Sequence, residues 1–239
     1  MVSGKVLLTG ATGGLGRVLA AQLRDAGRAV IATGRNREVG AGLTALGLRF
    51  QPADLAVDDL DGLLRGVECV HHLAALSSPW GPDHAFERGN VLATQRLLDA
   101  ARRQGVRRFV HASTPSIYTR PAHQLNLTEH CPLPARMVNA YARTKLAAER
   151  MVLAANRPGF ATVALRPRAI ISPHDTVLLP RLLGRARALG YAMTGDKLPA
   201  EEAARIGLIW QCVEDAALPD TVAALAARLA AMPSRALAE

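Results

Sequence analysis

Three glycines, Gly10, Gly13 and Gly16, constrain the fold of this chain more than any other feature. They follow an apolar run, residues 5–8, that predicts a short buried strand, and they open a stretch that predicts a helix over residues 15–26. Glycines in a turn from strand to helix let the backbone approach a pyrophosphate, which the helix N-terminus then stabilises. The alternative interpretation is a tight turn without a ligand.

Strand-like and helix-like segments alternate along most of the chain. The predicted strands are residues 2–8, 29–33, 48–52, 69–73, 108–112 and 161–166, and the predicted helices are residues 15–26, 37–46, 57–64, 85–104 and 141–156. Residues 115–134, rich in proline, histidine and asparagine, predict a loop. The alternation predicts an α/β fold: a Rossmann-type, doubly wound parallel sheet with a short, mostly helical C-terminal segment.

The end of the second predicted strand carries positive charge. Gly34 stands where a site for NAD usually has an acidic residue that holds the ribose 2′-hydroxyl. Arg35 and Arg37 follow, and a guanidinium suits a 2′-phosphate that a carboxylate would repel. These residues favour NADP(H), with NAD(H) as the alternative. Solvated loop arginines without a ligand are the other interpretation.

Tyr141 and Lys145 lie four residues apart on a predicted helix and therefore share one of its faces. A neighbouring ammonium stabilises the phenolate, which suits a general acid/base. The predicted strand 108–112 leads into two hydroxyls, Ser113 and Thr114, at the edge where such a sheet gathers its functional groups. One of these hydroxyls could hydrogen-bond a substrate oxygen beside Tyr141.

Taken together, these residues resemble the extended short-chain dehydrogenase/reductase superfamily, which holds nucleotide-sugar epimerases, dehydratases and 3β-hydroxysteroid dehydrogenases. The matching segments follow the family order over about residues 2–180. They are Thr9–Gly16, Ala53-Asp54-Leu55, residues 71–75, Asn90-Val91 with Thr94, Ser113-Thr114, Tyr141 with Lys145, and Leu165-Arg166-Pro167.

The resemblance implies a role for each matched position. Tyr141 would be the acid/base, Lys145 would hold the nicotinamide ribose, and Thr114 would orient the substrate oxygen. The implied cofactor-binding residues are Gly10, Thr12, Gly13, Gly14, Leu15, Gly16, Arg35, Asp54, Leu55, Leu73, Ala74, Ala75, Asn90, Tyr141, Lys145 and Pro167. His71, His72 and His111 fit strand-end packing better than metal ligation, since no metal-like spacing joins them. Asn90 has the alternative role of bonding the backbone.

From about residue 179 the sequence departs from this pattern. Residues 182–190, 194–203, 206–210 and 225–233 resemble the C-terminal part of an enoyl-CoA hydratase/isomerase (crotonase) protein. The parts that perform crotonase chemistry come earlier in that family and have no match here. We therefore expect an apparent chimera, with an NAD(P)-binding Rossmann domain over residues 1–180 and a helical crotonase-like segment over 181–239.

The spacing of this C-terminal segment predicts short helices over residues 199–205 and 218–232, with an apolar extended piece over 208–213. The apolar face of the second helix needs cover, on the sheet domain or on another copy. The second of these two arrangements would make the protein a homo-oligomer.

Composition restricts the class of partner. The net charge of +9 comes from scattered arginines, and no aromatic residues interleave with the cluster in residues 102–108, so nucleic-acid binding is not expected. The apolar runs are short for a membrane span, and no export leader is visible. Three widely spaced cysteines fit a reducing compartment and no metal pattern. We expect a cytoplasmic protein that takes a small-molecule substrate and no metal.

The leading hypothesis is an NAD(P)-dependent oxidoreductase that moves a hydride between nicotinamide and a hydroxyl or carbonyl substrate. A carbonyl or 3β-hydroxysteroid-like substrate is favoured by the apolar loop over residues 77–86, which carries Trp80. Two alternatives remain. The first is a dinucleotide-binding protein with little or no turnover, because its substrate lobe is replaced. The second is a nucleotide-sugar epimerase/dehydratase.

Overall fold

The computed structural model describes residues 4–78, 80–122, 126–167, 170, 184–194 and 196–230. The chain divides into two compact units, residues 1–175 and 176–239, and each is described by itself. The predicted boundary at residue 180 lies outside the described residues.

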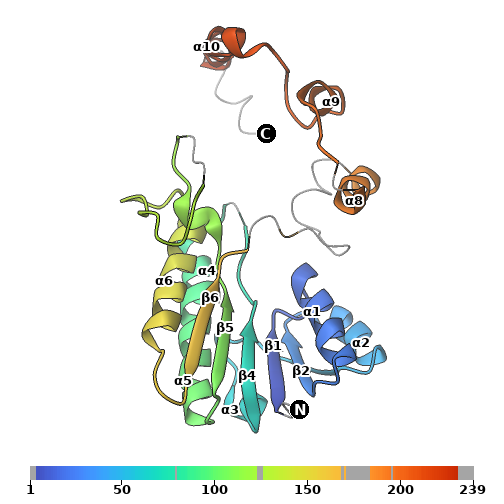
Figure 1. The fold of residues 1–239 in the computed structure, drawn as a ribbon, viewed down its shortest axis with the longest axis vertical. Helices are drawn as coiled ribbons and strands as arrows, with labels where there is room; N and C mark the ends of the chain where they lie inside the picture. Colours follow the sequence, from blue (N-terminus) through green and yellow to red (C-terminus); the bar gives the residue numbers. More distant parts are fainter. Residues whose placement is uncertain are drawn as a thin grey trace. The chain divides into compact units, whose positions relative to one another are not determined.

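The first unit is built on a six-stranded, wholly parallel sheet (Figure 1). Its strands are β1 (Lys5–Thr9), β2 (Val30–Gly34), β3 (Arg49–Pro52), β4 (Val67–His72), β5 (Arg108–Ala112) and β6 (Ala161–Leu165). They lie in the order β3-β2-β1-β4-β5-β6, and the order reverses between β1 and β4. All six predicted strands are present, and the predicted Rossmann-type fold is confirmed. In such sheets ligands bind at the carboxyl ends of the strands beside this reversal.

Helices cover both faces because successive residues of a buried strand point to opposite sides. Leu8 of β1 packs in one cluster with residues of α1 (Gly14–Asp25) and α2 (Arg37–Ala45). Leu7, the preceding residue, packs in a second cluster with α5 (Ala93–Arg103) and α6 (Ala140–Ala154). Figure 1 shows α1 and α2 beside β1 and β2, and α5 and α6 beside β5 and β6.

The predicted helix over residues 85–104 is interrupted. It consists of α4 (Asp83–Phe86), a π-helical stretch η1 (Glu87–Leu92) and α5. Asn90 lies in η1, is 1% exposed, and bonds the main chain of Leu76 through its side-chain amide. Local π-helical stretches occur frequently at functional sites.

Two further predictions need correction. The helix predicted over residues 57–64 begins only at α3 (Asp61–Leu64), because the Asp54 carboxylate accepts from Ala56 N and holds residues 54–58 as turns. The predicted loop over residues 115–134 contains a 3₁₀ helix, η2 (Pro115–Tyr118), since Thr114 caps it and proline suits its first position.

The regular secondary structure described in the second unit is helical. It contains α8 (Arg185–Thr194), α9 (Ala200–Arg205), η3 (Asp215–Ala217) and α10 (Leu218–Ala230). The two predicted helices are present, residues 208–213 are irregular, and α8 was not predicted as a helix. Among the helices described in either unit, none has the length and apolar character that a membrane crossing requires.

Candidate active site

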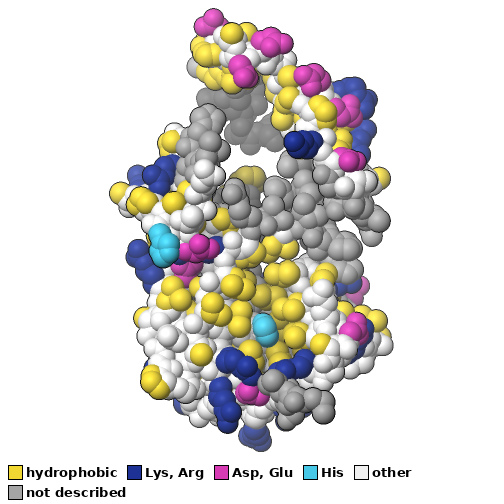
Figure 2. Space-filling model, in the orientation of Figure 1, with side chains coloured by type: hydrophobic (Ala, Val, Ile, Leu, Met, Phe, Trp, Pro, Cys, Tyr) yellow, Lys and Arg dark blue, Asp and Glu magenta, His cyan; other side chains and the backbone are white. Residues whose placement is uncertain are grey.

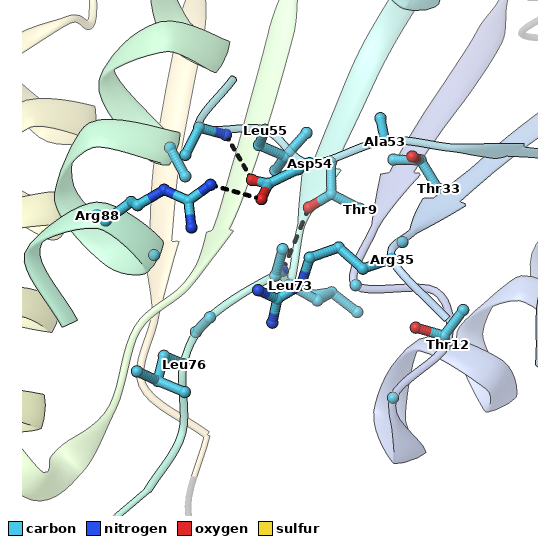
Figure 3. Close-up of a pocket in the computed structure, with 18 of the residues that line it drawn as sticks. Thr9, Thr12, Thr33, Arg35, Ala53, Asp54, Leu55, Leu73, Leu76 and Arg88 are labelled. Carbon is cyan, nitrogen blue, oxygen red and sulfur yellow. Dashed lines mark hydrogen bonds and ion pairs between the residues drawn. The ribbon is translucent and has the colours of Figure 1, made fainter. Parts of the chain in front are cut away.

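A pocket of about 450 Å³ opens at the carboxyl ends of β1 to β4 (Figure 3). Its lining residues come from the segments that follow these strands and from η1 and its neighbours. They are Thr9, Gly10, Thr12, Gly13, Thr33, Gly34, Arg35, Ala53, Asp54, Leu55, Ala56, Leu73, Ala74, Ala75, Leu76, His84, Ala85, Arg88, Gly89 and Ala93. This volume lies in the range of small-molecule and cofactor sites.

The glycine turn forms one wall of the pocket, and its shape depends on missing side chains. Gly10 has φ +68°, and a Cβ there would lie 2.7 Å from Ala74 N, in the neighbouring segment that follows β4. A Cβ on Gly16 would lie 2.1 Å from Gly10 O. Gly13 precedes α1 as its N-cap and makes no side-chain cap bond. The turn therefore brings bare backbone and a helix N-terminus to the pocket, as a pyrophosphate requires.

Asp54 and Leu55, two of the predicted cofactor-binding residues, line the pocket from the segment that follows β3. One carboxylate oxygen of Asp54 accepts from Ala56 N at 2.9 Å, and the other pairs with Arg88 at 2.9 Å. Figure 3 shows Arg88 reaching from its helix toward this carboxylate. Sequence reasoning missed Arg88. Arg88 lies four residues after His84, near the start of a predicted helix, so the two share a helix face, and both line the pocket. This spacing was the signal in the sequence that could have indicated Arg88.

Arg35 reaches the pocket from the end of β2, whereas Arg37 is exposed in the first turn of α2 and is not among the lining residues. A Cβ on Gly34 would lie 2.7 Å from the Thr12 hydroxyl oxygen. Thr12 thus occupies the space that a side chain at position 34 would need. The structure therefore places a cation, and no carboxylate, at this corner of the pocket.

The second group of predicted residues lies on α6 and β5. Asn139 caps α6 by accepting from Ala142 N at 2.8 Å, which starts the helix just before Tyr141. Tyr141 is half-buried. Lys145, one turn later, is 2% exposed; its ammonium donates to Ala112 O at 2.5 Å and lies 3.3 Å from His111 Nε2.

Buried charges surround this lysine. Burial lowers the pKa of Lys145 to about 8, although the Glu149 carboxylate one turn further on opposes that shift. Burial by itself would raise the pKa of Glu149, but hydrogen bonds from Arg166 reverse the shift and hold it below its ordinary value. Arg166 donates to both Glu149 oxygens and to the Tyr118 hydroxyl. The helix that carries Tyr141 thus also carries a buried cation, Lys145, of the kind that stabilises a phenolate.

The Thr114 hydroxyl has local partners in this structure. It accepts from Ser116 N at 3.2 Å and lies 3.1 Å from the Ser116 hydroxyl, and Thr114 is 6% exposed. Its role as the residue that orients substrate stays a prediction, with Ser113 and Ser116 beside it.

The structure gathers part of the predicted set in one place. Nine predicted cofactor residues line the pocket: Gly10, Thr12, Gly13, Arg35, Asp54, Leu55, Leu73, Ala74 and Ala75. In the part of the chain that is described, the other predicted residues do not line it: Gly14, Leu15, Gly16, Asn90, Thr114, Tyr141, Lys145 and Pro167. Gly14 to Gly16 form the first turn of α1 directly behind Gly13.

The parallel sheet, the glycine turn and the pocket at the strand reversal define a Rossmann-type protein with a pocket where such folds bind their ligands. The chain belongs to the NAD dependent epimerase/dehydratase family, whose model matches residues 6–199. This match continues past the predicted boundary at residue 180.

Relatives support the same family. An uncharacterised Escherichia coli (strain K12) protein, YbjS, is 40% identical over 183 residues, which cover 74% of this chain and 54% of that protein. A 4-hydroxy-2-methyl-3-oxo-4-farnesyl-3,4-dihydroquinoline-1-oxide ketoreductase of Stigmatella aurantiaca is 38% identical over 77% of this chain and 55% of its own length. A 2-alkyl-3-oxoalkanoate reductase of Stenotrophomonas maltophilia (strain K279a) is 38% identical, with coverages of 80% and 58%. The chain spans a little over half the length of these relatives.

Among solved structures, MoeE5 in complex with UDP-glucose and NAD is similar to this chain. The identity is 36%, the TM-score is 0.65, and the match covers 75% of this chain and 60% of MoeE5.

Proposed function

We propose that the chain binds NADP(H) and, with it, interconverts a hydroxyl and a carbonyl on a small substrate. One observation carries the proposal: a glycine-walled pocket at the strand reversal, in a unit whose helix α6 carries Tyr141 and Lys145 on one face. The names of the relatives, which include a ketoreductase and a 2-alkyl-3-oxoalkanoate reductase, support the same chemistry.

The residues of α6 suit the proton step. In the oxidation direction, the Tyr141 oxygen takes the proton of the substrate hydroxyl while the C–H hydrogen leaves with its electron pair, and a carbonyl remains. When bound, a nicotinamide would accept this hydride, or supply it in the reverse direction. The Lys145 ammonium, held by Ala112 O, stabilises the phenolate electrostatically. Thr114 would orient the substrate oxygen.

The choice of NADP(H) over NAD(H) rests on Arg35. Arg35 lines the pocket beside Gly34 and Thr12, where its guanidinium suits a 2′-phosphate. The solved structure described above contains NAD, so NAD(H) is the alternative.

We favour a carbonyl substrate with apolar groups over a nucleotide sugar. Trp80, in the loop that follows the pocket wall, is 80% exposed and offers apolar surface. The relatives named as reductases act on keto compounds by their names. The UDP-glucose in MoeE5 supports an epimerase or dehydratase as the second candidate.

Calorimetric titration of NADPH and NADH, followed by a turnover screen of ketones, β-keto acids, alcohols and UDP-sugars, tests the proposal. We expect tighter binding of NADPH and ketone-dependent loss of its absorbance. Arg35→Asp should weaken NADPH binding by about tenfold or more and favour NADH. Arg37→Asp is the matched control, since Arg37 does not line the pocket. Equal effects of both variants would remove the 2′-phosphate argument.

A dinucleotide-binding protein with little or no turnover is the competing function. The crotonase resemblance of the C-terminal segment supports it, and among the residues of that unit whose burial is described, only Ala203 is buried. Tight dinucleotide binding without turnover across the whole panel would favour this function over the reductase.

We also propose that the protein is a cytoplasmic homo-oligomer. Val163 and Leu165 of the edge strand β6 are 44% and 54% exposed, and Figure 2 shows hydrophobic side chains gathered on the visible face of the first unit. Sedimentation analysis would test this, and a monomer at micromolar concentration would contradict it.

A further inference from the structure

One wall of the pocket has no regular secondary structure of its own. Residues 73–76, called here the 73–76 wall, follow β4 directly, and all four line the pocket. Such a segment keeps its position only if other groups bond its main chain. A Cβ on Gly10 would lie 2.7 Å from Ala74 N, so a shift of the 73–76 wall would also disturb the glycine turn.

His72 stands behind this wall as the centre of a buried hydrogen-bond chain. Its Nδ1 lies 2.8 Å from the Thr9 hydroxyl and its Nε2 lies 2.9 Å from the Thr94 hydroxyl. His72 and Thr9 are 0% exposed, and Thr94 is 1% exposed. These hydrogen bonds therefore join β1, β4 and α5 through side chains that water does not reach.

Only one arrangement of protons satisfies these contacts. Thr94 donates its hydroxyl proton to Asn90 O at 2.6 Å, so its oxygen must accept from His72 Nε2–H. In a neutral imidazole Nδ1 is then an acceptor, and the Thr9 hydroxyl donates to it. The Thr9 oxygen is left to accept from Ala74 N at 3.2 Å. Figure 3 shows this last bond between Thr9 and the wall.

The charge state of His72 agrees with this arrangement. Burial, and next the nearby Lys145 cation, lower the pKa of His72 to about 3. The imidazole is therefore neutral at ordinary pH, as this arrangement of hydrogen bonds requires.

Asn90 bonds the other end of the wall. Its Oδ1 accepts from Leu76 N at 2.7 Å, and its Nδ2 donates to Leu76 O at 3.2 Å and to the Thr144 hydroxyl at 3.0 Å. Thr144 lies on α6 between Tyr141 and Lys145. The same buried network thus connects the pocket wall to the helix that carries the proposed acid/base.

We propose that His72, supported by Thr94 and Asn90, is a positioning residue that fixes the 73–76 wall for dinucleotide binding. None of the three lines the pocket, so they act through the wall. The proposal rests on the proposed cofactor site, and it deepens that site by assigning the residues that hold its shape.

Thr94→Val tests the proposal, because it keeps the side-chain shape and removes the hydroxyl between His72 and Asn90. We expect the dissociation constant for NADPH to rise about tenfold and amide exchange at Ala74 and Leu76 to speed up about tenfold, since a buried group loses its partner. Thr94→Ser, which keeps the hydroxyl, should restore both values to within about twofold of the wild type.

Thr162→Val is the matched control. Thr162 also donates its hydroxyl to a main-chain carbonyl, Val152 O at 2.7 Å, but it lies on β6 and does not line the pocket. We expect this variant to lose thermal stability while keeping wild-type NADPH affinity and wild-type exchange at Ala74 and Leu76. If Thr94→Val does not yield folded protein, His72→Asn provides the same comparison, because asparagine is too short to bridge both hydroxyls.

The outcomes separate the two proposals. Wild-type affinity and exchange in Thr94→Val would overturn the positioning role and leave the proposed function intact. A wild-type protein that binds neither NADPH nor NADH would overturn the proposed function, whereas the exchange comparison would still test what holds the wall. Equal losses of affinity in Thr94→Val and Thr162→Val would reduce the network to a structural role and also overturn the proposal.

Discussion

The cofactor pocket and the group around Lys145 are built in opposite ways. The pocket takes its form from missing side chains at Gly10, Gly16 and Gly34, and its charged groups lie at the surface. The Lys145 group takes its form from charges kept out of water, since Lys145 and Glu149 are each 2% exposed. Adding carbon atoms should therefore damage the first region, whereas changing protonation or removing a polar atom should damage the second.

The largest effect is expected from Tyr141→Phe. Loss of the hydroxyl removes the acid/base, so turnover should fall by about 10³-fold while NADPH affinity stays within about twofold. Steady-state kinetics on the best ketone of the screen, together with calorimetry, measure both. Tyr191→Phe, in α8 of the second unit, is the control for loss of a phenol. Turnover unchanged in Tyr141→Phe would rule out the proposed mechanism.

Gly10→Ala tests the pocket itself, by adding a carbon atom where the structure has no room for one. The added Cβ meets Ala74 N at 2.7 Å, and the residue has φ +68°, so strain and overpacking together should weaken NADPH binding about 100-fold. Gly105→Ala is a sharp control, because Gly105 has φ +70° and a Cβ there would meet nothing within 4 Å. Both variants should lose some stability, and only Gly10→Ala should lose affinity. Equal NADPH affinities of Gly10→Ala and Gly105→Ala would show that the 73–76 wall shifts to make room for the added Cβ.

The pocket was more predictable from the sequence than the Lys145 group because its determinants are local. Gly10 to Gly16 mark a turn between a strand and a helix that adjoin in sequence. In the Lys145 group only one feature is equally local: Tyr141 and Lys145 share a face by helix periodicity. The partners of Lys145, in contrast, lie on β5, 33 and 34 residues away. Periodicity within one helix does not specify such contacts.

The π-helical stretch η1 failed to appear in the prediction for a similar reason. Its apolar spacing continues a helix, and the bonds from Asn90 to Leu76 join residues 14 apart that meet only when the sheet is assembled. Arg88 belongs to the same stretch, and its partner Asp54 is 34 residues away. Tertiary contacts of this kind override local helical preference.

Acid should lower the stability of the protein through two buried histidines: His72 behind the pocket wall and His111 beside Lys145. Burial lowers the pKa of His72 to about 3 and that of His111 well below its ordinary value, so both stay neutral in the folded protein. The unfolded chain binds protons below pH 6.5, so stability is present above that pH and is lost as the pH falls toward 3. For His72 the loss at pH 5 is about 2 kcal/mol.

Urea unfolding at pH 7.5 and pH 5.0 measures this loss as a difference in the free energy of unfolding. His111 has the same sign and adds to it. Glu149 contributes little in this interval, since its pKa is held below its ordinary value, which itself lies below pH 5. Equal free energies at the two pH values would contradict a neutral, buried His72 and the hydrogen-bond chain built on it.

The smallest effect is expected at the pocket rim, from Arg88→Ala. Arg88 is 51% exposed and its ion pair with Asp54 is screened by solvent, while Asp54 keeps its bond from Ala56 N. NADPH affinity should therefore fall only about two- to fivefold, with a weaker dependence on salt than the wild type. Arg103→Ala is the matched control, because Arg103 forms a similar exposed pair with Asp61 at 2.7 Å and does not line the pocket. A loss of about 30-fold or more would mean that Arg88 binds the dinucleotide itself, and the pocket would then depend on charge as the Lys145 group does.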